Sequence, residues 1–328
     1  MPPFEYIQAT DPAQAVATVT ADPAAAYLAG GTTQLDLVLK DGIFSPERLV
    51  DITRLPLKGI SASDAAIRVG ATTTMEELAA DPAVIERLPF VREALLHGAS
   101  VQLRNMATVG GNLLQRTRCP YFQDTGMPCN KREPGSGCQA TAPGADTEHM
   151  AILGHSPFCV ATHPSDMAVA LTALGARVRV TGQNGDRLIE MPGLHRLPDG
   201  MPDRDTVLRP GELITEVELP PPPAGRSAYR KVRERASFAF ALVSLAAVLE
   251  TGPDGRVRDC RLALGGVAHV PWRAHAAERV ALSLPATPET FARAAEEELR
   301  YSRPLPGNEY KVTLARNLIA SVLEELAA

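Results

Sequence analysis

Along this chain of 328 residues, segments with the hydrophobic spacing of a helix alternate with segments that have the spacing of a strand. Near the start, the pattern predicts a strand over residues 5–9, a helix over 13–19 capped by Asp11, and a strand over 24–30. A helix over 33–40 follows directly. Later runs predict strands in RLVDITRL, IRVGATTTM and ARVRVTG, and helices over 74–80, 82–97, 164–174, 238–249 and 288–299. This mixture, with no repeat of fixed length, indicates a protein of mixed helix and sheet.

Two breaks in the pattern divide the chain. The proline run ELPPPPAGRSAY interrupts any regular element and is typical of a linker, so we place the main boundary near Gly225. The part after it, residues 225–328, predicts a compact α+β domain with strands over 256–265 and helices over 291–301 and 310–326. A second break near residues 57–59 separates a small βαβ-like lobe, about 1–58, from a second lobe, 59–224.

Composition and charge exclude several classes of protein. A hydrophobic content of 45% lets a chain of this length bury a large core. The longest apolar stretch, FAFALVSLAAVL at residues 238–249, is too short to span a bilayer, so we expect a buried helix and no membrane span. The net charge of −5 and the lack of a long basic run argue against nucleic acid as a partner. The opening MPPFEYIQATDPAQA shows no export signal.

Four of the five cysteines lie in one stretch rich in glycine and proline, at Cys119, Cys129, Cys138 and Cys159. The stretch, residues 115–160, shows neither helical nor strand periodicity, and loops of this length are usually functional. The spacing C-x9-C-x8-C-x20-C lacks the close cysteine pairs of most zinc sites and favours a loop wrapped around a larger 4Fe-4S cluster. A structural zinc ion and two disulfides are the alternatives.

Other residues in and beyond this stretch bear on the same site. Four nearby cations would offset the negative charge of four thiolates. Equally, they could be ordinary solvated charges of the loop. The four are Arg116, Arg118, Lys131 and Arg132. We expect no histidine ligand, because four cysteines complete the usual ligand set of a cubane; the nearby histidines are His149, His155 and His163. Cys260, alone in RDCRLALGGV, is expected to be a buried small hydrophobic residue.

Two glycine-rich turns form a second candidate site. In LAGGTTQLDL, residues 28–37, a strand runs into a Gly-Gly-Thr-Thr turn at a predicted helix start, where bare backbone amides, hydroxyls and the helix dipole favour a phosphate. An ordinary tight turn is the alternative. A similar turn, NMATVGGNLLQ at residues 105–115, leads directly to Cys119. The two turns could hold a dinucleotide close to the metal centre, although no G-x-G-x-x-G fingerprint and no hydrolytic motif is present.

Four segments carry a family resemblance over essentially the whole chain: LAGGTTQLDL, RNMATVGGNL, ATHPSDMAVAL and YRKVRERASFAFALVSLAA. In this order they resemble the FAD-binding medium subunit of the molybdenum hydroxylase (xanthine dehydrogenase) family. The insert CPYFQDTGMPCNKREPGSGC and the later Cys159 are similar to the flavoprotein subunit of periplasmic aldehyde oxidoreductases, in which this loop holds a 4Fe-4S cluster. The resemblance implies an α+β fold: a two-lobed FAD-binding domain of the vanillyl-alcohol-oxidase type over residues 1–224, followed by a smaller C-terminal domain over 225–328.

The same resemblance implies a set of FAD-binding positions. They are Leu28, Ala29, Gly30, Gly31, Thr32, Thr33, Gln34 and Leu35 around the diphosphate, Thr108, Gly111 and Asn112 in the second wall, and Asp166, Ile214 and Lys231. The last three have plain alternatives. Asp166 could cap a helix, Ile214 could be ordinary core, and Lys231 could be a solvated cation.

By this resemblance, the chain is an electron-transfer flavoprotein subunit, with FAD and a 4Fe-4S cluster, of a molybdenum-dependent aldehyde oxidoreductase. It implies two partners, a large molybdenum cofactor subunit and a small 2Fe-2S subunit, and an external electron acceptor. The alternatives are the corresponding subunit of a 4-hydroxybenzoyl-CoA reductase or xanthine dehydrogenase-like complex, and a non-redox, zinc-stapled nucleotide-binding scaffold. We expect a periplasmic location, reached by co-export with a signal-bearing partner, with the cytoplasm as the alternative.

Overall fold

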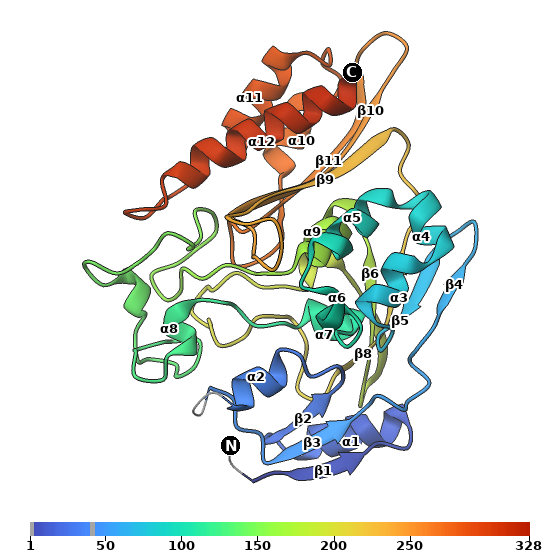
Figure 1. The fold of residues 1–328 in the computed structure, drawn as a ribbon, viewed down its shortest axis with the longest axis vertical. Coiled ribbons are helices and arrows are strands. Elements are labelled where there is room, and N and C mark those ends of the chain that lie inside the picture. The colour runs from blue at the N-terminus through green and yellow to red at the C-terminus, as the bar shows by residue number, and fades with distance from the viewer. Residues whose placement is uncertain (1–2, 40–42) are drawn as a thin grey trace.

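The computed structural model describes residues 3–39 and 43–328 of the chain. At the N-terminus, three parallel strands form a sheet in the order β1-β3-β2, and two helices accompany them (Figure 1). These elements are β1 (Glu5–Gln8), α1 (Pro12–Ala21), β2 (Ala25–Leu28), α2 (Gln34–Leu39) and β3 (Arg48–Asp51). Asp11 caps α1, as predicted, by accepting a hydrogen bond from the Gln14 N–H at 2.8 Å. Lys40, at the end of the predicted second helix, lies outside the described residues.

A second, antiparallel sheet of five strands occupies the middle of the molecule in the order β4-β5-β8-β6-β7. Its strands are β4 (Ile60–Ala62), β5 (Ile67–Gly70), β6 (Arg177–Gly182), β7 (Gly185–Glu190) and β8 (Leu213–Leu219). The helices of this part are α3 (Met75–Ala80), α4 (Pro82–Arg87), α5 (Pro89–His97), α6 (Val101–Arg104), α7 (Val109–Leu113) and α9 (Asp166–Leu174), with a 3-10 turn η2 (Met191–Gly193). The single helix predicted over 82–97 divides into α4 and α5 because Pro89 follows Leu88, which leaves the helical region.

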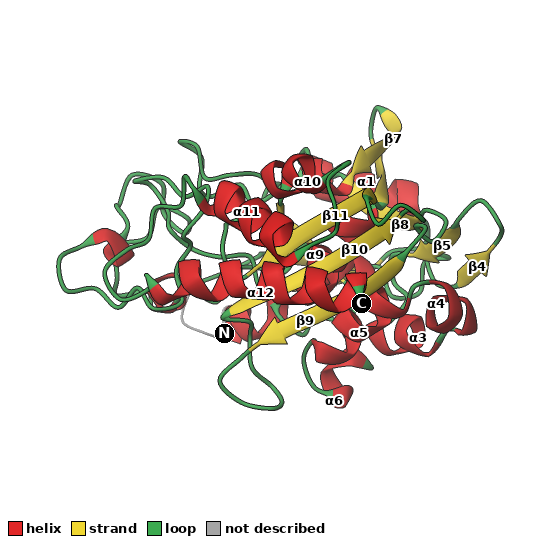
Figure 2. Ribbon diagram, turned by 90° about the horizontal axis from the view of Figure 1, so that it is seen from above, coloured by secondary structure: helices red, strands yellow, loops and turns green. Residues whose placement is uncertain are grey.

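The third sheet is antiparallel, in the order β12-β11-β10-β9, and belongs to the C-terminal part of the chain. Its elements are β9 (Arg226–Val232), β10 (Val243–Thr251), β11 (Val257–Gly265), β12 (Trp272–Arg273), α10 (His275–Ala281), α11 (Pro288–Leu299) and α12 (Tyr310–Ala327). Helices α10 and α12 pack on one face of the sheet, with α11 against both of them (Figure 2), while α5 and α9 pack on the other face. Cys260 is buried in β11, as predicted.

The buried helix predicted over residues 238–249 is wrong, because most of this segment is strand β10. The strand lies between α12 on one face and α9 on the other, so nearly all of its side chains are buried. A strand covered on both faces shows a continuous apolar run instead of an alternating one, and by its spacing alone such a run also fits a buried helix. Among residues 3–39 and 43–328, no helix is both long and apolar enough to cross a bilayer.

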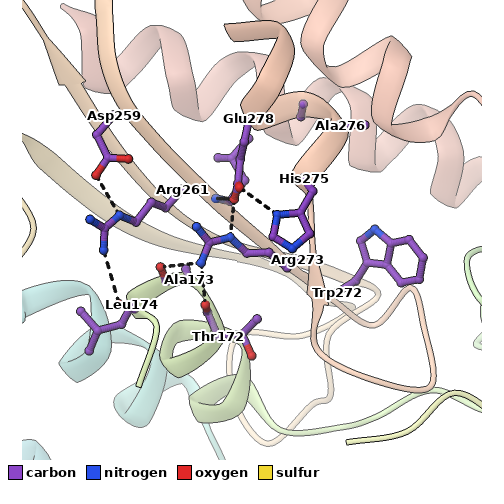
Figure 3. Close-up of polar contacts among 12 residues, drawn as sticks. Thr172, Ala173, Leu174, Asp259, Arg261, Trp272, Arg273, His275, Ala276 and Glu278 are labelled. Atoms are coloured by element: carbon purple, nitrogen blue, oxygen red, sulfur yellow. Dashed lines mark hydrogen bonds and ion pairs between the residues drawn. The ribbon is translucent and has the colours of Figure 1, made fainter. Parts of the chain in front are cut away.

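Helix α9 connects the second and third sheets. Two arginines of the third sheet reach the carboxyl end of α9 (Figure 3). Arg273 Nη1 donates to the carbonyls of Thr172 and Ala173 at 2.9 and 3.1 Å, and Arg261 Nη1 donates to the carbonyl of Leu174 at 3.5 Å. These bonds satisfy carbonyls that have no partner within the helix, and they place positive charge at the negative end of its dipole.

The cysteine stretch is a long loop, as predicted. Between α7 and α9 the chain forms only α8 (Pro120–Gln123) and the 3-10 turn η1 (Gln139–Thr141), together with isolated β-bridges such as the one between Cys129 and Cys138. The loop projects to one side of the molecule, where α8 marks it in Figure 1. Its apolar side chains, among them Phe122 and Met150, form a small hydrophobic core together with Leu37 and Ile43 of the N-terminal part.

Candidate functional site

A cavity of about 1060 Å³ lies where the N-terminal sheet, the second sheet and the loop before β10 meet. Its volume is at the upper end of the range for small-molecule sites, as a dinucleotide requires. Most of the FAD-binding positions expected from the sequence line it: Ala29, Gly30, Gly31, Thr32, Thr33, Gln34, Thr108, Gly111, Asn112, Asp166, Ile214 and Lys231. Leu28 and Leu35 do not line it but lie next to it, within 3.3 Å of a Cβ built on Gly31.

The two glycine-rich turns touch each other across one side of this cavity. A Cβ atom added to Gly30 would lie 1.9 Å from the carbonyl oxygen of Met106, so only glycine allows the first turn to approach the second this closely. Gly31 has a φ of +68°, which side chains other than glycine rarely adopt. The turns therefore form one continuous wall, with the backbone of residues 30–33 and the start of α7 facing the same space.

The second turn is shaped by a helix cap and a side-chain pair. Thr108 is the N-cap of α7, and its Oγ1 accepts a hydrogen bond from the Gly111 N–H at 3.2 Å. Asn112 Oδ1 accepts a hydrogen bond from Ser165 Oγ at 2.5 Å. Ser165 is the N-cap of α9, so this bond joins the second turn to the helix that carries Asp166.

Asp166 and Lys231 form a buried ion pair beside the cavity. Lys231 Nζ lies 2.8 Å from Asp166 Oδ2, and Tyr229 donates its hydroxyl to the other carboxylate oxygen. Burial raises the pKa of Asp166, and the charge of Lys231 opposes this shift. The helix-cap alternative for Asp166 is wrong, because Ser165 is the cap, and the solvated-cation alternative for Lys231 is wrong, because its side chain is 1% exposed. Ile214 is buried in the core and also lines the cavity.

The four cysteines of the loop surround a second, small cavity of about 10 Å³. All four line it: Cys119, Cys129, Cys138 and Cys159. Cys119 and Phe122 line the large cavity as well, so the two cavities share a wall. None of the three nearby histidines lines the small cavity.

Backbone N–H groups point toward the cysteine sulfurs. Cys119 receives them from Tyr121 and Phe122, and Cys159 receives one from Ala161. Burial raises the pKa of Cys119 to about 12 and that of Cys159 to about 11, while these N–H groups oppose the shift. Hydrogen bonds to sulfur are one of the ways in which proteins tune iron–sulfur clusters.

The four cysteines line one small cavity but do not form a site for a single metal ion. Within residues 3–39 and 43–328, no three His, Cys, Asp or Glu side chains approach closely enough to hold a single metal ion. A tetrahedral zinc site needs four ligands at about 2.3 Å from one ion.

The cations near the cysteines all contact protein groups, and the solvated-charge alternative is wrong for Lys131, which is buried. Lys131 is buried and pairs with Asp205, and Arg116 lies 2.5 Å from the same carboxylate. These two cations, with burial opposing them, hold the pKa of Asp205 at about 2. Arg118 donates to Thr33 Oγ1 at 2.9 Å, and Arg132 donates to backbone carbonyls of its own loop.

Sequence reasoning missed two aromatic residues at the mouth of the large cavity. Phe238 and Phe240 line it and are more than half exposed, and the Arg118 guanidinium lies 5.1 Å above the Phe240 ring. Both had been placed in the buried helix that proved to be a strand. Asp205 was also missed, because nothing in the sequence near residue 205 indicates that it reaches the cysteine loop.

Two family models together cover almost the whole chain. One, described as the FAD binding domain in molybdopterin dehydrogenase, matches residues 2–222, and the other, the CO dehydrogenase flavoprotein C-terminal domain, matches residues 227–326.

Individual proteins are similar over most or all of their length. The chain is 46% identical to the aldehyde oxidoreductase FAD-binding subunit PaoB of Escherichia coli (strain K12), covering 100% of this chain and 99% of the relative. It is 27% identical to the glyceraldehyde dehydrogenase medium chain of Sulfolobus acidocaldarius, covering 85% and 80%. Among solved structures, the reconstituted CO dehydrogenase from Oligotropha carboxidovorans matches with a TM-score of 0.77 at 25% identity, covering 100% of this chain and 99% of the matched chain.

Proposed function

Because this chain belongs to the family of FAD-binding medium subunits of molybdenum hydroxylases, we propose that it is the flavoprotein subunit of an aldehyde oxidoreductase and carries a 4Fe-4S cluster beside FAD. The family makes it a subunit of a multi-subunit oxidoreductase. One observation carries the cluster part of the proposal: Cys119 and Phe122 belong to the walls of both cavities. Two redox groups held in these cavities would be close neighbours.

The large cavity fits FAD in its shape and in its donors. FAD, when bound, supplies one- and two-electron redox chemistry that side chains lack. The turn at residues 30–33 offers backbone N–H groups and two hydroxyls to the diphosphate, and Thr108 and Asn112 continue the same wall. The Asp166–Lys231 pair keeps a positive and a negative group in fixed positions at the cavity edge, where they can orient polar groups of the cofactor.

The four cysteines that line the small cavity are the ligand set that a 4Fe-4S cluster takes. A 4Fe-4S cluster, when bound, supplies a one-electron site of tunable potential. Cys119, Cys129, Cys138 and Cys159 would hold it, and apolar side chains such as Phe122 and Met150 pack in the same hydrophobic cluster as these cysteines. Thiolates need compensating N–H donors and cations in a buried site, and the loop provides both.

The remaining parts of the proposal concern the complex. We place aldehyde oxidation in a large molybdenum subunit and the first electron transfers in a small 2Fe-2S subunit, and we assign delivery to an external acceptor to this chain. The aldehyde substrate rests on the relative that is 46% identical. We also propose a periplasmic location through co-export with a partner, which cell fractionation of the native host would test.

The cofactor content of the purified complex tests the proposal. We expect an anaerobically purified complex to contain FAD and about four irons on this subunit, with the visible absorption of both groups. Cys129→Ala should lose the iron, whereas the matched variant Cys260→Ala, which removes the buried cysteine of β11, should retain it. Zinc in place of iron, or equal iron in both variants, would contradict the cluster, and absence of flavin would contradict the FAD site.

A further inference from the structure

Lys131 is a buried cation in the wall of the cysteine cavity. It lies in the turn between Cys129 and Cys138, its side chain is 1% exposed, and it lines the cavity with all four cysteines. Lysine is rarely buried unless a partner compensates its charge. The position of Lys131 beside four metal-binding candidates therefore calls for a physical explanation.

All three N–H donors of the Lys131 ammonium are occupied by other groups. They point to the carbonyl of Pro202 at 2.8 Å, to Asp205 Oδ1, and to His269 Nε2 at 2.6 Å. His269 Nδ1 lies 2.9 Å from the carbonyl oxygen of Arg196, so the ring proton is on Nδ1 and Nε2 accepts from lysine. With no donor left over, Lys131 acts on the cysteine site as a fixed charge through space and does not donate a hydrogen bond to sulfur.

Lys131, Arg116 and Asp205 together carry excess positive charge, with Lys131 buried and the Arg116 side chain 30% exposed. Asp205 is shared between two cations, Lys131 and Arg116, and in the described part of the chain neither cation has another carboxylate within ion-pair distance. A buried uncompensated charge is costly, and four neutral thiols would not compensate it. Four thiolates around a cluster would, because that assembly carries net negative charge.

We propose that Lys131, held in place by Asp205 and His269, is the charge that raises the reduction potential of the cluster, an inference that rests on the proposed 4Fe-4S site. Net charge around a cluster is one of the main determinants of its potential. A nearby cation favours the reduced, more negative state, so the cluster accepts an electron more readily. Lys131 thereby sets the potential of the group next to the FAD cavity.

The test is a redox titration of the whole complex, monitored by electron paramagnetic resonance. Iron and acid-labile sulfide are counted in each variant. Lys131→Met removes the charge at similar length and leaves Asp205 paired with Arg116. We expect it to retain iron and to shift the cluster midpoint to a lower potential, with the flavin midpoint as an internal reference. The control Lys58→Met, an exposed lysine paired with Glu77, should leave both midpoints unchanged.

A second variant covers the case in which Lys131→Met binds no iron. Asp205→Asn keeps an oxygen acceptor for Lys131 but removes the compensating negative charge, so the midpoint should rise. An unchanged midpoint in an iron-containing variant overturns the inference, and so does loss of iron from both variants, because Lys131 would then be merely structural. Wild-type complex without iron would instead refute the proposed cluster itself.

Discussion

Lys231 Nζ lies 2.8 Å from the Asp166 carboxylate and joins strand β9 to the first turn of helix α9 beside the large cavity. The side chains are 1% and 6% exposed, so neither charge is solvated. Lys231 also donates to the carbonyl of His97 at 3.1 Å, and Tyr229 donates to Asp166. Each charge offsets the desolvation cost of the other, because a buried ion that loses its partner keeps its full desolvation cost.

Removing both members of this pair should cost less than the two single removals added together. Lys231→Met leaves a buried carboxylate and should lower the free energy of unfolding by about 3–5 kcal/mol, with loss of FAD. The double variant Asp166→Asn, Lys231→Met should lose less than the sum of the two single variants. Urea unfolding of the four proteins gives the coupling energy, and strictly additive losses would show that the pair does not interact.

Gly30→Ala should separate the two glycine-rich turns. The added Cβ would lie 1.9 Å from the Met106 carbonyl oxygen, and the clash is with backbone, which cannot move aside easily. We expect a stability loss of about 1–3 kcal/mol and weaker FAD binding, measured by flavin release after purification. Gly193→Ala is the matched control, because its Cβ would meet nothing within 4 Å and should change stability by about 0.5 kcal/mol or less. Equal flavin content in the two variants would contradict this role for Gly30.

Arg273→Lys should loosen the contact between the third sheet and helix α9. Arg273 donates to the carbonyls of Thr172 and Ala173 and also pairs with Glu278 (Figure 3), and a lysine cannot make all three contacts. We expect the free energy of unfolding to fall by about 1–3 kcal/mol. Arg258→Lys, in an exposed pair with Asp254, should change it by less than about 0.5 kcal/mol. Equal denaturation midpoints for the two variants would contradict this role of Arg273.

Acid should destabilise the protein through His269. Burial, with the charge of Lys131, lowers the pKa of His269 to about 4, from 6.5 in an unperturbed histidine. Between these two pH values the unfolded chain binds a proton that the folded chain does not. The contribution of His269 to the free energy of unfolding is therefore fully present above pH 6.5 and is lost as the pH falls toward 4. The loss from this group should be about 3 kcal/mol.

The variant His269→Gln checks this contribution. Its free energy of unfolding, measured between pH 4 and 7, should depend less steeply on pH than that of the wild type. Some dependence should remain, because burial also lowers the pKa of His163 and of His195. Identical slopes in the two proteins would assign the acid sensitivity to other groups.

Features that depend on a few neighbouring residues could be predicted from the sequence. The Asp11 cap, helix α11 over Pro288–Leu299 and the irregular cysteine loop were predicted correctly, because caps, helical spacing and prolines act over short distances. The glycine-rich turns are also features that neighbouring residues predict. Their Gly-Gly pairs are visible in the sequence, and the structure adds that the two turns touch.

The error at β10 has a long-range origin. Its apolar run fits a buried helix and a doubly covered strand equally well, and the choice depends on β9, β11, α9 and α12, which lie elsewhere in the sequence. Local spacing carries no information about which elements will cover a segment. Phe238 and Phe240 were misplaced for the same reason.

The sequence by itself determined which residues could bind cofactors: two glycine-rich turns and four cysteines in one loop. Only the tertiary structure decided that the turns touch, that Cys119 lies between two cavities, and that Asp205 compensates Lys131. The ion pair joins residues 74 positions apart, and the large cavity is lined by residues from the N-terminal sheet, the second sheet and the loop before β10. Such contacts result from burial of apolar surface over the whole chain, a global property that no short segment encodes.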